Sequence, residues 1–272
     1  MQFSPATKLT AVFGNPVIHS LSPALHNAIY ENENVDAVML AFGNPSIEKL
    51  VSAMRALPIH LAAVTMPHKQ AIMPLLDEID GTAREIGAVN TVVNREGKLH
   101  GFNTDVVGIA DALHSVALKG SNALLIGAGG AARTVAYLLN REGAHLFCAN
   151  RDRSQADELL GSFGGVFVEP ADFGKTPFDV IVNATPIGMK SNVDESPFPE
   201  EYIKSDSAVF DLVYSPLQTK LLASAKRRGA RTISGLTMFL AQGLEQERIW
   251  LGRNIESEPY WQLLDEKVRS PR

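Results

Sequence analysis

Hydrophobic residues in the first hundred positions fall into short runs separated by amphipathic stretches. Apolar side chains at Ile47, Leu50, Val51, Met54 and Leu57 have the spacing of one face of a helix. The whole pattern predicts strands at residues 10–13, 38–42 and 61–65, helices from Ser22-Pro23 and over 46–57, and a hairpin of strands 89–94 and 98–102. Strands alternating with helices, with an antiparallel addition, predict an α/β domain.

The alternation restarts after residue 105 and becomes more regular. It predicts strands at residues 123–126, 145–149, 180–183 and 208–211, and helices at 106–118, 131–142, 154–162, 218–228, 238–251 and 260–268. This order is typical of a parallel, doubly wound sheet of the Rossmann type. We therefore expect an α/β protein of two domains, residues 1–105 and 106–237, with the final helices in 238–272 packing back on the first domain.

A glycine-rich turn joins the strand at 123–126 to the helix that follows it. The turn consists of Gly127, Ala128, Gly129, Gly130, Ala131 and Ala132. Gly127 permits a tight turn, Gly129 lets the backbone approach a pyrophosphate, and Ala132 is small enough for close helix–strand packing. The free N–H groups of a helix N-terminus favour an anion. The turn predicts dinucleotide binding; a tight strand–helix turn without a ligand is the alternative.

The loop after the next strand contains Asn150, Arg151, Asp152 and Arg153. About twenty residues after the glycines, a dinucleotide-binding domain reads the adenosine ribose. A carboxylate there selects NAD, whereas arginine favours the additional phosphate of NADP. Arg151 therefore indicates NADP, and Asp152 would oppose that phosphate if it pointed inward. Alternatively, this is a solvated loop in which Asp152 or Ser154 caps the next helix.

Polar residues gather at the ends of the strands predicted in the first domain, in four segments at residues 19–23, 65–69, 87–91 and 102–105. Open α/β sheets bind ligands at strand ends, and these hydroxyl, amide, lysine and aspartate side chains suit a substrate with many hydroxyls. Taken singly, Ser22 and Asp105 could be helix caps, Asn90 a turn residue and Lys69 a surface charge. Together the four segments indicate a site.

Composition narrows the remaining classes. With 45% hydrophobic and 20% charged residues the chain resembles an ordinary globular protein, and its net charge of −5 argues against a nucleic-acid partner. Cys148 is the single cysteine, so we expect a buried, unreactive thiol and no internal disulfide. The sequence has no signal-peptide pattern, apolar run of membrane-spanning length or Cys/His metal set. We expect a cytoplasmic monomer or homodimer without a metal or membrane partner.

Six motifs resemble the shikimate dehydrogenase family in order and approximate spacing. They are residues 14–27 (GNPVIHSLSPALHN), 64–69 (VTMPHK), 87–91 (GAVNT), 103–108 (NTDVVG), 183–189 (NATPIGM) and 235–243 (GLTMFLAQG). The resemblance covers almost the whole chain. It implies a substrate domain followed by a Rossmann NADP-binding domain. The implied reaction is the reversible NADP-dependent reduction of 3-dehydroshikimate to shikimate, in aromatic amino-acid biosynthesis.

The resemblance also implies roles for individual residues. Lys69 and Asp105 are the implied catalytic pair, in which Asp105 orients Lys69. The hydroxyls of Ser20 and Ser22 are implied to bind the substrate carboxylate, which Tyr214 is also implied to reach. The implied contacts of the ring hydroxyls are Thr65, Asn90, Asp105 and Gln242. The cofactor-binding set comprises the glycine-rich turn, the 150–152 loop, Thr185, and the backbone near Met189 and Gly235.

Three positions depart from the family pattern. Ala63 stands where the family usually has asparagine, as in a divergent shikimate dehydrogenase-like subgroup. Asp152 and Gln155 stand where an NADP-binding member usually has threonine and a basic residue. Three alternatives follow: an NAD-dependent quinate/shikimate dehydrogenase, a paralogue with another polyol-acid substrate, or a non-catalytic nucleotide-binding module. The presence of both Lys69 and Asp105 argues against the last.

Overall fold

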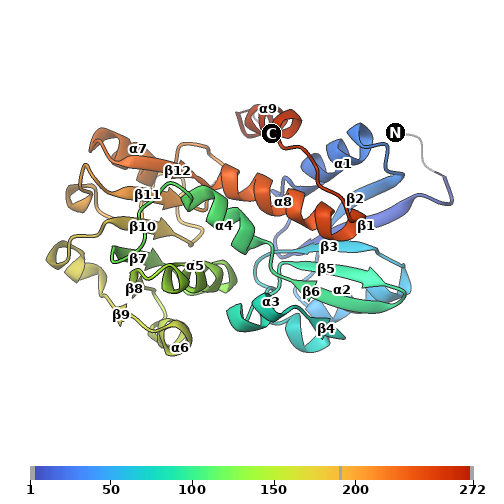
Figure 1. Cartoon of the computed structure of the whole chain (residues 1–272), viewed down its shortest axis with the longest axis horizontal. Coiled ribbons are helices and arrows are strands. Elements are labelled where there is room, and N and C mark those ends of the chain that lie inside the picture. The colour runs from blue at the N-terminus through green and yellow to red at the C-terminus, as the bar shows by residue number, and fades with distance from the viewer. Residues whose placement is uncertain (1–3, 190–191, 270–272) are drawn as a thin grey trace. The chain divides into compact units, whose positions relative to one another are not determined.

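The computed structural model describes residues 4–189 and 192–269, and the chain divides into two compact units (Figure 1). Unit one extends to Asp105 and includes Leu240–Leu264, whereas unit two comprises Val106–Phe239 and continues from Asp265. Unit one is thus assembled from two separate stretches of the sequence. None of the helices in the described ranges is long and apolar enough to span a membrane.

Unit one contains a mixed six-stranded sheet in the order β2-β1-β3-β5-β6-β4. Its strands are β1 (Lys8–Gly14), β2 (Ala37–Gly43), β3 (Leu61–Val64), β4 (Glu78–Ile79), β5 (Thr91–Arg95) and β6 (Lys98–Phe102). Strand β1 runs parallel to β2 and β3, and the predicted hairpin is the antiparallel pair β5–β6. The carboxyl ends of β1, β3 and β6 meet at one edge of the sheet, together with the beginning of β5.

Helices cover both faces of this sheet. They are α1 (Ser22–Asn32), α2 (Ile47–Ala56), α3 (Gly81–Ile86), part of α8 (Gly235–Leu251) and part of α9 (Glu258–Arg269). Four of the five residues of the predicted apolar stripe pack on Phe13, Ala62 and Val64, whereas Leu57 is exposed and lies just after α2. Leu61 faces the other way, into a cluster with Tyr30 of α1 and Trp250 of α8. The alternation along β3 is that of a strand buried on both faces.

Unit two is a six-stranded parallel sheet in the order β12-β11-β10-β7-β8-β9. The strands are β7 (Asn122–Ile126), β8 (His145–Ala149), β9 (Val166–Phe167), β10 (Val180–Asn183), β11 (Ala208–Asp211) and β12 (Arg231–Ser234). The helices are α4 (Asp105–Leu113), α5 (Gly130–Arg141), α6 (Arg153–Phe163) and α7 (Lys220–Arg227). Read from β9, the order is that of the Rossmann fold, and the strand order reverses between β7 and β10.

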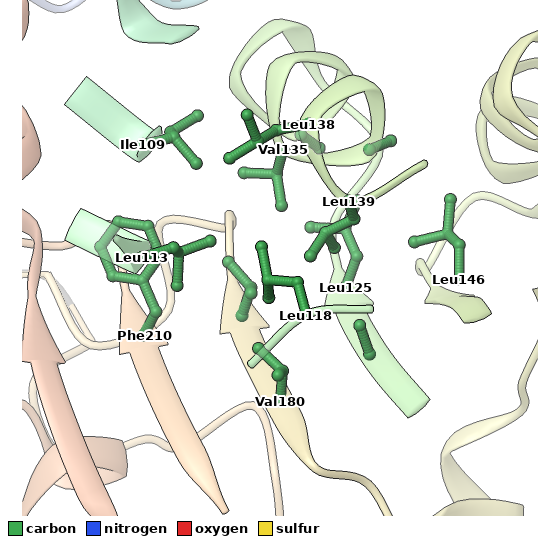
Figure 2. Close-up of a cluster of buried hydrophobic side chains, with 14 of the residues drawn as sticks. Ile109, Leu113, Leu118, Leu125, Val135, Leu138, Leu139, Leu146, Val180 and Phe210 are labelled. Atoms are coloured by element: carbon green, nitrogen blue, oxygen red, sulfur yellow. The ribbon is translucent and has the colours of Figure 1, made fainter. Parts of the chain in front are cut away.

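Apolar side chains fill both faces of this second sheet. On one face, Ile109 and Leu113 of α4 and Val135 and Leu139 of α5 pack on Leu125 and its neighbours (Figure 2). On the other face, a cluster around Leu124, Ile181, Val209 and Leu221 is closed by a group of phenylalanines, among them Phe178 and Phe198. The α/β class and the Rossmann domain predicted from the sequence are confirmed.

Several details differ from the sequence prediction. The helix expected at 106–118 ends at Leu113, where the N–H of Val116 bonds to the Leu113 carbonyl and the chain turns so that Leu118 enters the core. Helix α8 begins at Gly235, three residues earlier than expected. Strands β4, β9 and β12 and helix α3 were missed, because each is only two to six residues long and lacks a long apolar repeat.

Candidate active site

Two serines lie at the start of α1, after the loop that follows β1. The Ser20 hydroxyl donates to Oγ of Ser22 at 3.1 Å and accepts from the Ser22 backbone N–H at 3.2 Å. Ser22 is the first residue of α1, with Pro23 next, and its side chain does not cap the helix. The two hydroxyls therefore form a polar pair at a helix N-terminus, which suits an anionic group.

Lys69 and Asp105 come from different strand ends and are in contact. Lys69 follows β3, and its carbonyl accepts from the N–H of Val89 at 2.8 Å. Asp105 begins α4, directly after β6. The Lys69 ammonium donates to Oδ2 of Asp105, and only 14% and 4% of the two side chains are exposed. Lys69 is thus an oriented, largely dehydrated cation rather than a surface charge.

Asn90 links this pair to the rest of the site. Its Nδ2 donates to Oδ1 of Asp105 at 2.9 Å and to Oε1 of Gln242 at 3.3 Å. Its Oδ1 accepts from the backbone N–H of Thr104 at 2.7 Å and from the Thr91 hydroxyl at 2.8 Å. Asn90 is 2% exposed, so these hydrogen bonds fix the orientation of its amide. Gln242 comes from α8, the distant segment that completes unit one.

Thr65 lies at the same edge, immediately after β3. Its N–H donates to the carbonyl of Phe13, and its methyl group leaves only 2.5 Å for a Cβ at Gly14. Glycine is therefore required at position 14 where the chain leaves β1 beside Thr65. Of the seven substrate-binding residues predicted, the structure joins Asn90, Asp105 and Gln242 by hydrogen bonds, pairs Ser20 with Ser22, and places Thr65 at the same edge of the sheet.

This arrangement can bind a polyol and move a proton. The Lys69 ammonium keeps donors beyond the one directed at Asp105, so it can hold a substrate oxygen while negative charge develops there. Asp105 fixes that ammonium and shares its other oxygen with Asn90. No group of three His, Cys, Asp or Glu side chains in residues 4–189 and 192–269 could hold a metal ion.

The glycine-rich turn of unit two leaves backbone donors for a ligand. Gly129 precedes α5 and provides no side-chain cap, and the first helical hydrogen bond runs from the N–H of Arg133 to the Gly129 carbonyl. The N–H groups of Gly130, Ala131 and Ala132 precede that bond and thus have no acceptor within the helix. A Cβ at Gly129 would meet nothing within 4 Å, whereas Gly127 has a φ of +113° and abuts Ala184. The turn fits a pyrophosphate.

The charged residues in and beside the loop after β8 differ in their partners. Asp152 caps α6, because its Oδ1 accepts from the N–H groups of Ser154 and Gln155, and its Oδ2 accepts from the Gln155 amide. Arg153 is paired with Asp157 and stacks over the Phe167 ring at 4.1 Å. Arg151 is exposed and has no partner in the described part of the chain. The helix-cap alternative is therefore correct for the Asp152 side chain, and Asn150 bonds to the Asp152 carbonyl.

Thr185, Met189 and Gly235 lie at the carboxyl ends of β10 and β12. Thr185 donates its N–H and its hydroxyl to Oδ1 of Asn183, and Met189 ends the same turn with its N–H on the Pro186 carbonyl. A Cβ at Gly235 would lie 2.2 Å from the Leu212 carbonyl oxygen, so only glycine fits there. Tyr214, predicted to reach the substrate, belongs to unit two and packs on Phe239; its substrate contact stays a prediction.

Comparison with known proteins identifies the family of this chain. Residues 12–92 match the model of the shikimate dehydrogenase substrate binding domain, and residues 109–205 match that of the shikimate / quinate 5-dehydrogenase domain. The shikimate dehydrogenase (NADP+) of Moorella thermoacetica is 41% identical over 268 residues, covering 93% of this chain and 91% of that protein. The chain belongs to the shikimate dehydrogenase family.

Solved structures of this family resemble the whole chain. The shikimate dehydrogenase of Aquifex aeolicus has a TM-score of 0.88 at 40% identity, over 99% of this chain and 100% of that one. The Thermus thermophilus enzyme, determined in complex with NADP(H) and shikimate, has a TM-score of 0.86 at 34% identity, over 96% and 99% of the two chains.

Sequence reasoning missed two structural residues, one in each unit. Thr104 bridges Asn90 and Thr91 through its hydroxyl, and Asp211 supports the Asn183 turn with a fully buried carboxylate. Thr104 lies within the 103–108 motif, whose resemblance to the family implied no role for it. The position of Asp211 at the end of a predicted strand was the available signal, because a carboxylate following an apolar run must find partners or water.

Proposed function

We propose that this chain is a shikimate dehydrogenase that catalyses the reversible, NADP-dependent reduction of 3-dehydroshikimate to shikimate. The observation that carries the proposal is the contact of Lys69 with Asp105, both largely buried and tied through Asn90 to Gln242. A nucleotide-binding module that had lost catalysis would have no use for this dehydrated lysine. The family membership supplies the substrate class.

In the proposed mechanism, the reacting hydroxyl of shikimate bonds to Lys69. As the carbon loses hydride, the oxygen must lose its proton, and the Lys69–Asp105 pair accepts it; in the reverse direction the pair returns the proton to the new alkoxide. Bound NADP+ supplies the hydride acceptor, and NADPH the hydride donor. Asp105 holds the lysine in place, and Asn90 fixes Asp105.

The remaining polar residues of unit one orient the substrate. We assign the carboxylate of shikimate to the hydroxyls of Ser20 and Ser22, which lie at the N-terminus of α1. We assign its other ring hydroxyls to Thr65, Asn90 and Gln242. Two serine hydroxyls that donate to the substrate carboxylate suit a ligand recognised mainly through its own hydroxyl groups.

The preference for NADP rests on the loop after β8. Asp152 is turned to the N-terminus of α6, so it does not oppose a ribose phosphate, and Arg153 is held by Asp157 and Phe167. Arg151 alone keeps its guanidinium available for the phosphate or for stacking on adenine. We assign the pyrophosphate to Gly127–Ala131 and the nicotinamide end to the backbone around Thr185, Met189 and Gly235.

The test is the initial rate of cofactor reduction, followed by near-ultraviolet absorbance, for shikimate and quinate each with NADP+ and NAD+. We expect turnover to be fastest with shikimate and NADP+. A preference for NAD+ or quinate would instead establish a quinate/shikimate dehydrogenase. Absence of turnover in all four mixtures would refute the proposed substrate and leave a paralogue that acts on another polyol acid.

We also propose that the enzyme needs no partner beyond a second copy of itself. The net charge of −5 argues against a nucleic-acid partner. Sedimentation of the purified protein distinguishes the monomer from the homodimer, and co-sedimentation with a larger component would contradict the proposal.

A further inference from the structure

Asp211 is a buried carboxylate outside the catalytic pair. It ends β11 and its residue is 0% exposed. Its Oδ1 accepts from Nδ2 of Asn183 at 2.9 Å and from the backbone N–H of Val213 at 3.0 Å, and its Oδ2 accepts from the Thr219 hydroxyl at 2.6 Å. Three donors and no acceptor face this side chain, an environment that matches a carboxylate rather than a carboxylic acid.

The three donors belong to three different segments of unit two. Asn183 ends β10 and holds the following turn through Thr185 and the Ile187 carbonyl. Val213 begins the loop after β11, and Thr219 is the N-cap of α7. At Gly188, which has a φ of +97°, a Cβ would lie 3.4 Å from Thr219 and 4.0 Å from Oδ2 of Asp211. One carboxylate therefore joins the turn to the loop.

The backbone of Asp211 also meets the third segment assigned to the nicotinamide end. A Cβ at Gly235 would lie 2.9 Å from the Asp211 carbonyl oxygen and 2.2 Å from that of Leu212. Thr185, Met189 and Gly235 thus all belong to segments that are tied to Asp211 or packed on its main chain.

We propose that Asp211 is a positioning residue for the nicotinamide end of the cofactor, its ionised carboxylate holding the 183–189 turn and the 213–219 loop in the receptive shape. This inference rests on the proposed function, which supplies the cofactor. Protonation would turn one acceptor oxygen into a donor and place it against a group that already donates. One of the three hydrogen bonds would then be lost or rearranged.

The environment of Asp211 makes this protonation accessible. Burial raises the pKa of Asp211 to about 6, although the hydrogen bonds from Thr219, Val213 and Asn183 lower it. No ionisable neighbour contributes to that shift. Among the described residues, the ionisable side chains on the flanking elements are Asp179 before β10, Tyr214 in the loop, Lys220, Lys226 and Arg227 on α7, and Arg231 on β12.

The test measures the affinities of wild type, Asp211→Asn and Asp179→Asn for two ligands. Asparagine keeps the shape of Asp211 but, like the protonated acid, directs a donor at a donor. Asp179→Asn is the matched control: it makes the same change at the opposite end of β10, where Asp179 bonds to Asn122 and Lys204. Affinities for NADP+ and for 2′-phospho-ADP-ribose, which lacks nicotinamide, are measured by calorimetry between pH 5 and pH 8.

We expect Asp211→Asn to weaken NADP+ binding about tenfold at pH 8 and to leave 2′-phospho-ADP-ribose binding within twofold. The ratio of wild-type to variant affinity should fall towards one as the pH drops through about 6. Using a ratio removes the titration of the ligand's own phosphate, whose pKa is also about 6. Asp179→Asn should bind both ligands as wild type does.

Equal losses for both ligands, or a ratio independent of pH, would overturn the positioning role and leave the proposed function intact. A wild type that binds NADP+ but does not oxidise shikimate would refute the substrate assignment without touching the inference. A wild type that binds no NADP+ at all would refute both.

Discussion

The Lys69 side chain can be removed while the other substrate donors stay in place. We expect Lys69→Ala to lower kcat about 10³-fold, because the developing alkoxide would lose the ammonium that stabilises it and relays its proton to Asp105, and to change shikimate affinity only a few-fold. Initial rates give kcat, and calorimetry gives the affinity. Lys49→Ala removes an exposed lysine of α2 and serves as the control. Turnover within a few-fold of wild type would remove Lys69 from the mechanism.

Arg151 and Asp152 are adjacent, and the structure predicts different consequences of removing their side chains. Arg151→Ala should reduce the NADP+ over NAD+ preference in kcat/KM by about 10- to 100-fold, the value of a charge-assisted hydrogen bond. Asp152→Ala should cost about 1 kcal/mol of stability through the lost helix cap and barely change the cofactor ratio.

Initial rates with each cofactor and urea unfolding distinguish the two variants. Arg153→Ala is the control, since that guanidinium is already paired with Asp157 and stacked on Phe167. A large change in cofactor preference on replacing Asp152 would mean that its carboxylate reads the ribose after all.

The raised pKa of Asp211 predicts how its contribution to stability varies with pH. The folded chain keeps the proton up to about pH 6, whereas the unfolded chain releases it near the ordinary aspartate pKa of 3.8. The stability contributed by Asp211 therefore falls as the pH rises from about 4 to 6, by about 3 kcal/mol in total.

Asp211→Asn does not titrate, so its free energy of unfolding relative to wild type should rise by up to that amount between about pH 4 and pH 7. Urea unfolding at a series of pH values measures the difference, and a constant difference would contradict the shift. If Asp211 also positions the cofactor, its charge is kept at the expense of stability, as is common at functional sites.

At the scale of elements, α1 and α8 are joined by a buried polar network. His26 and Tyr30 of α1 both bond to Oε1 of Glu247 on α8, and Thr10 of β1 bonds to the Tyr30 hydroxyl at 2.9 Å. His26 and Glu247 are both 0% exposed. Burial, followed by the charge of Glu247, raises the pKa of Tyr30 well above its usual value, so that its hydroxyl stays a donor.

Removing one partner of this network leaves the others buried and unsatisfied. We expect Glu247→Ala to lower the free energy of unfolding by about 3–5 kcal/mol. Glu245→Ala, on the same helix, breaks only a pair with the more exposed Arg248 and should cost less than about 1 kcal/mol. Equal costs in urea unfolding would show that the network contributes nothing specific.

These elements also show how far the sequence could be interpreted. Apolar spacing located α2, α5 and the four central strands of the Rossmann sheet, because each buries a regular stripe or run. Local pattern could not reveal that Glu247 meets His26, 221 positions away, and it left open whether Asp152 caps a helix or faces a ribose. Such pairings depend on how distant elements pack. Lys69 and Asp105 were identified as candidates because they belong to motifs. Their contact could be seen only in the structure, where the sheet brings the ends of β3 and β6 to one edge.

At the scale of the whole molecule, Cys148 reports on opening of the core. It lies in β8, 0% exposed, and burial raises its thiol pKa to about 11. Only the thiolate of an opened chain should react with an alkylating reagent at neutral pH. Ligands that bind the folded state should therefore slow labelling, by about 100-fold at a concentration 100 times the dissociation constant.

NADP+ must protect Cys148 if it binds unit two. The effect of shikimate depends on whether the two units open together. Unit one is completed by Leu240–Leu264, and α8 runs without a break from Gly235, in unit two, to Leu251, in unit one. Because one helix contributes to both cores, we expect the units to open together, so that shikimate slows labelling as NADP+ does. Labelling followed by mass spectrometry tests this, and protection by NADP+ alone would show that unit two opens while unit one stays folded.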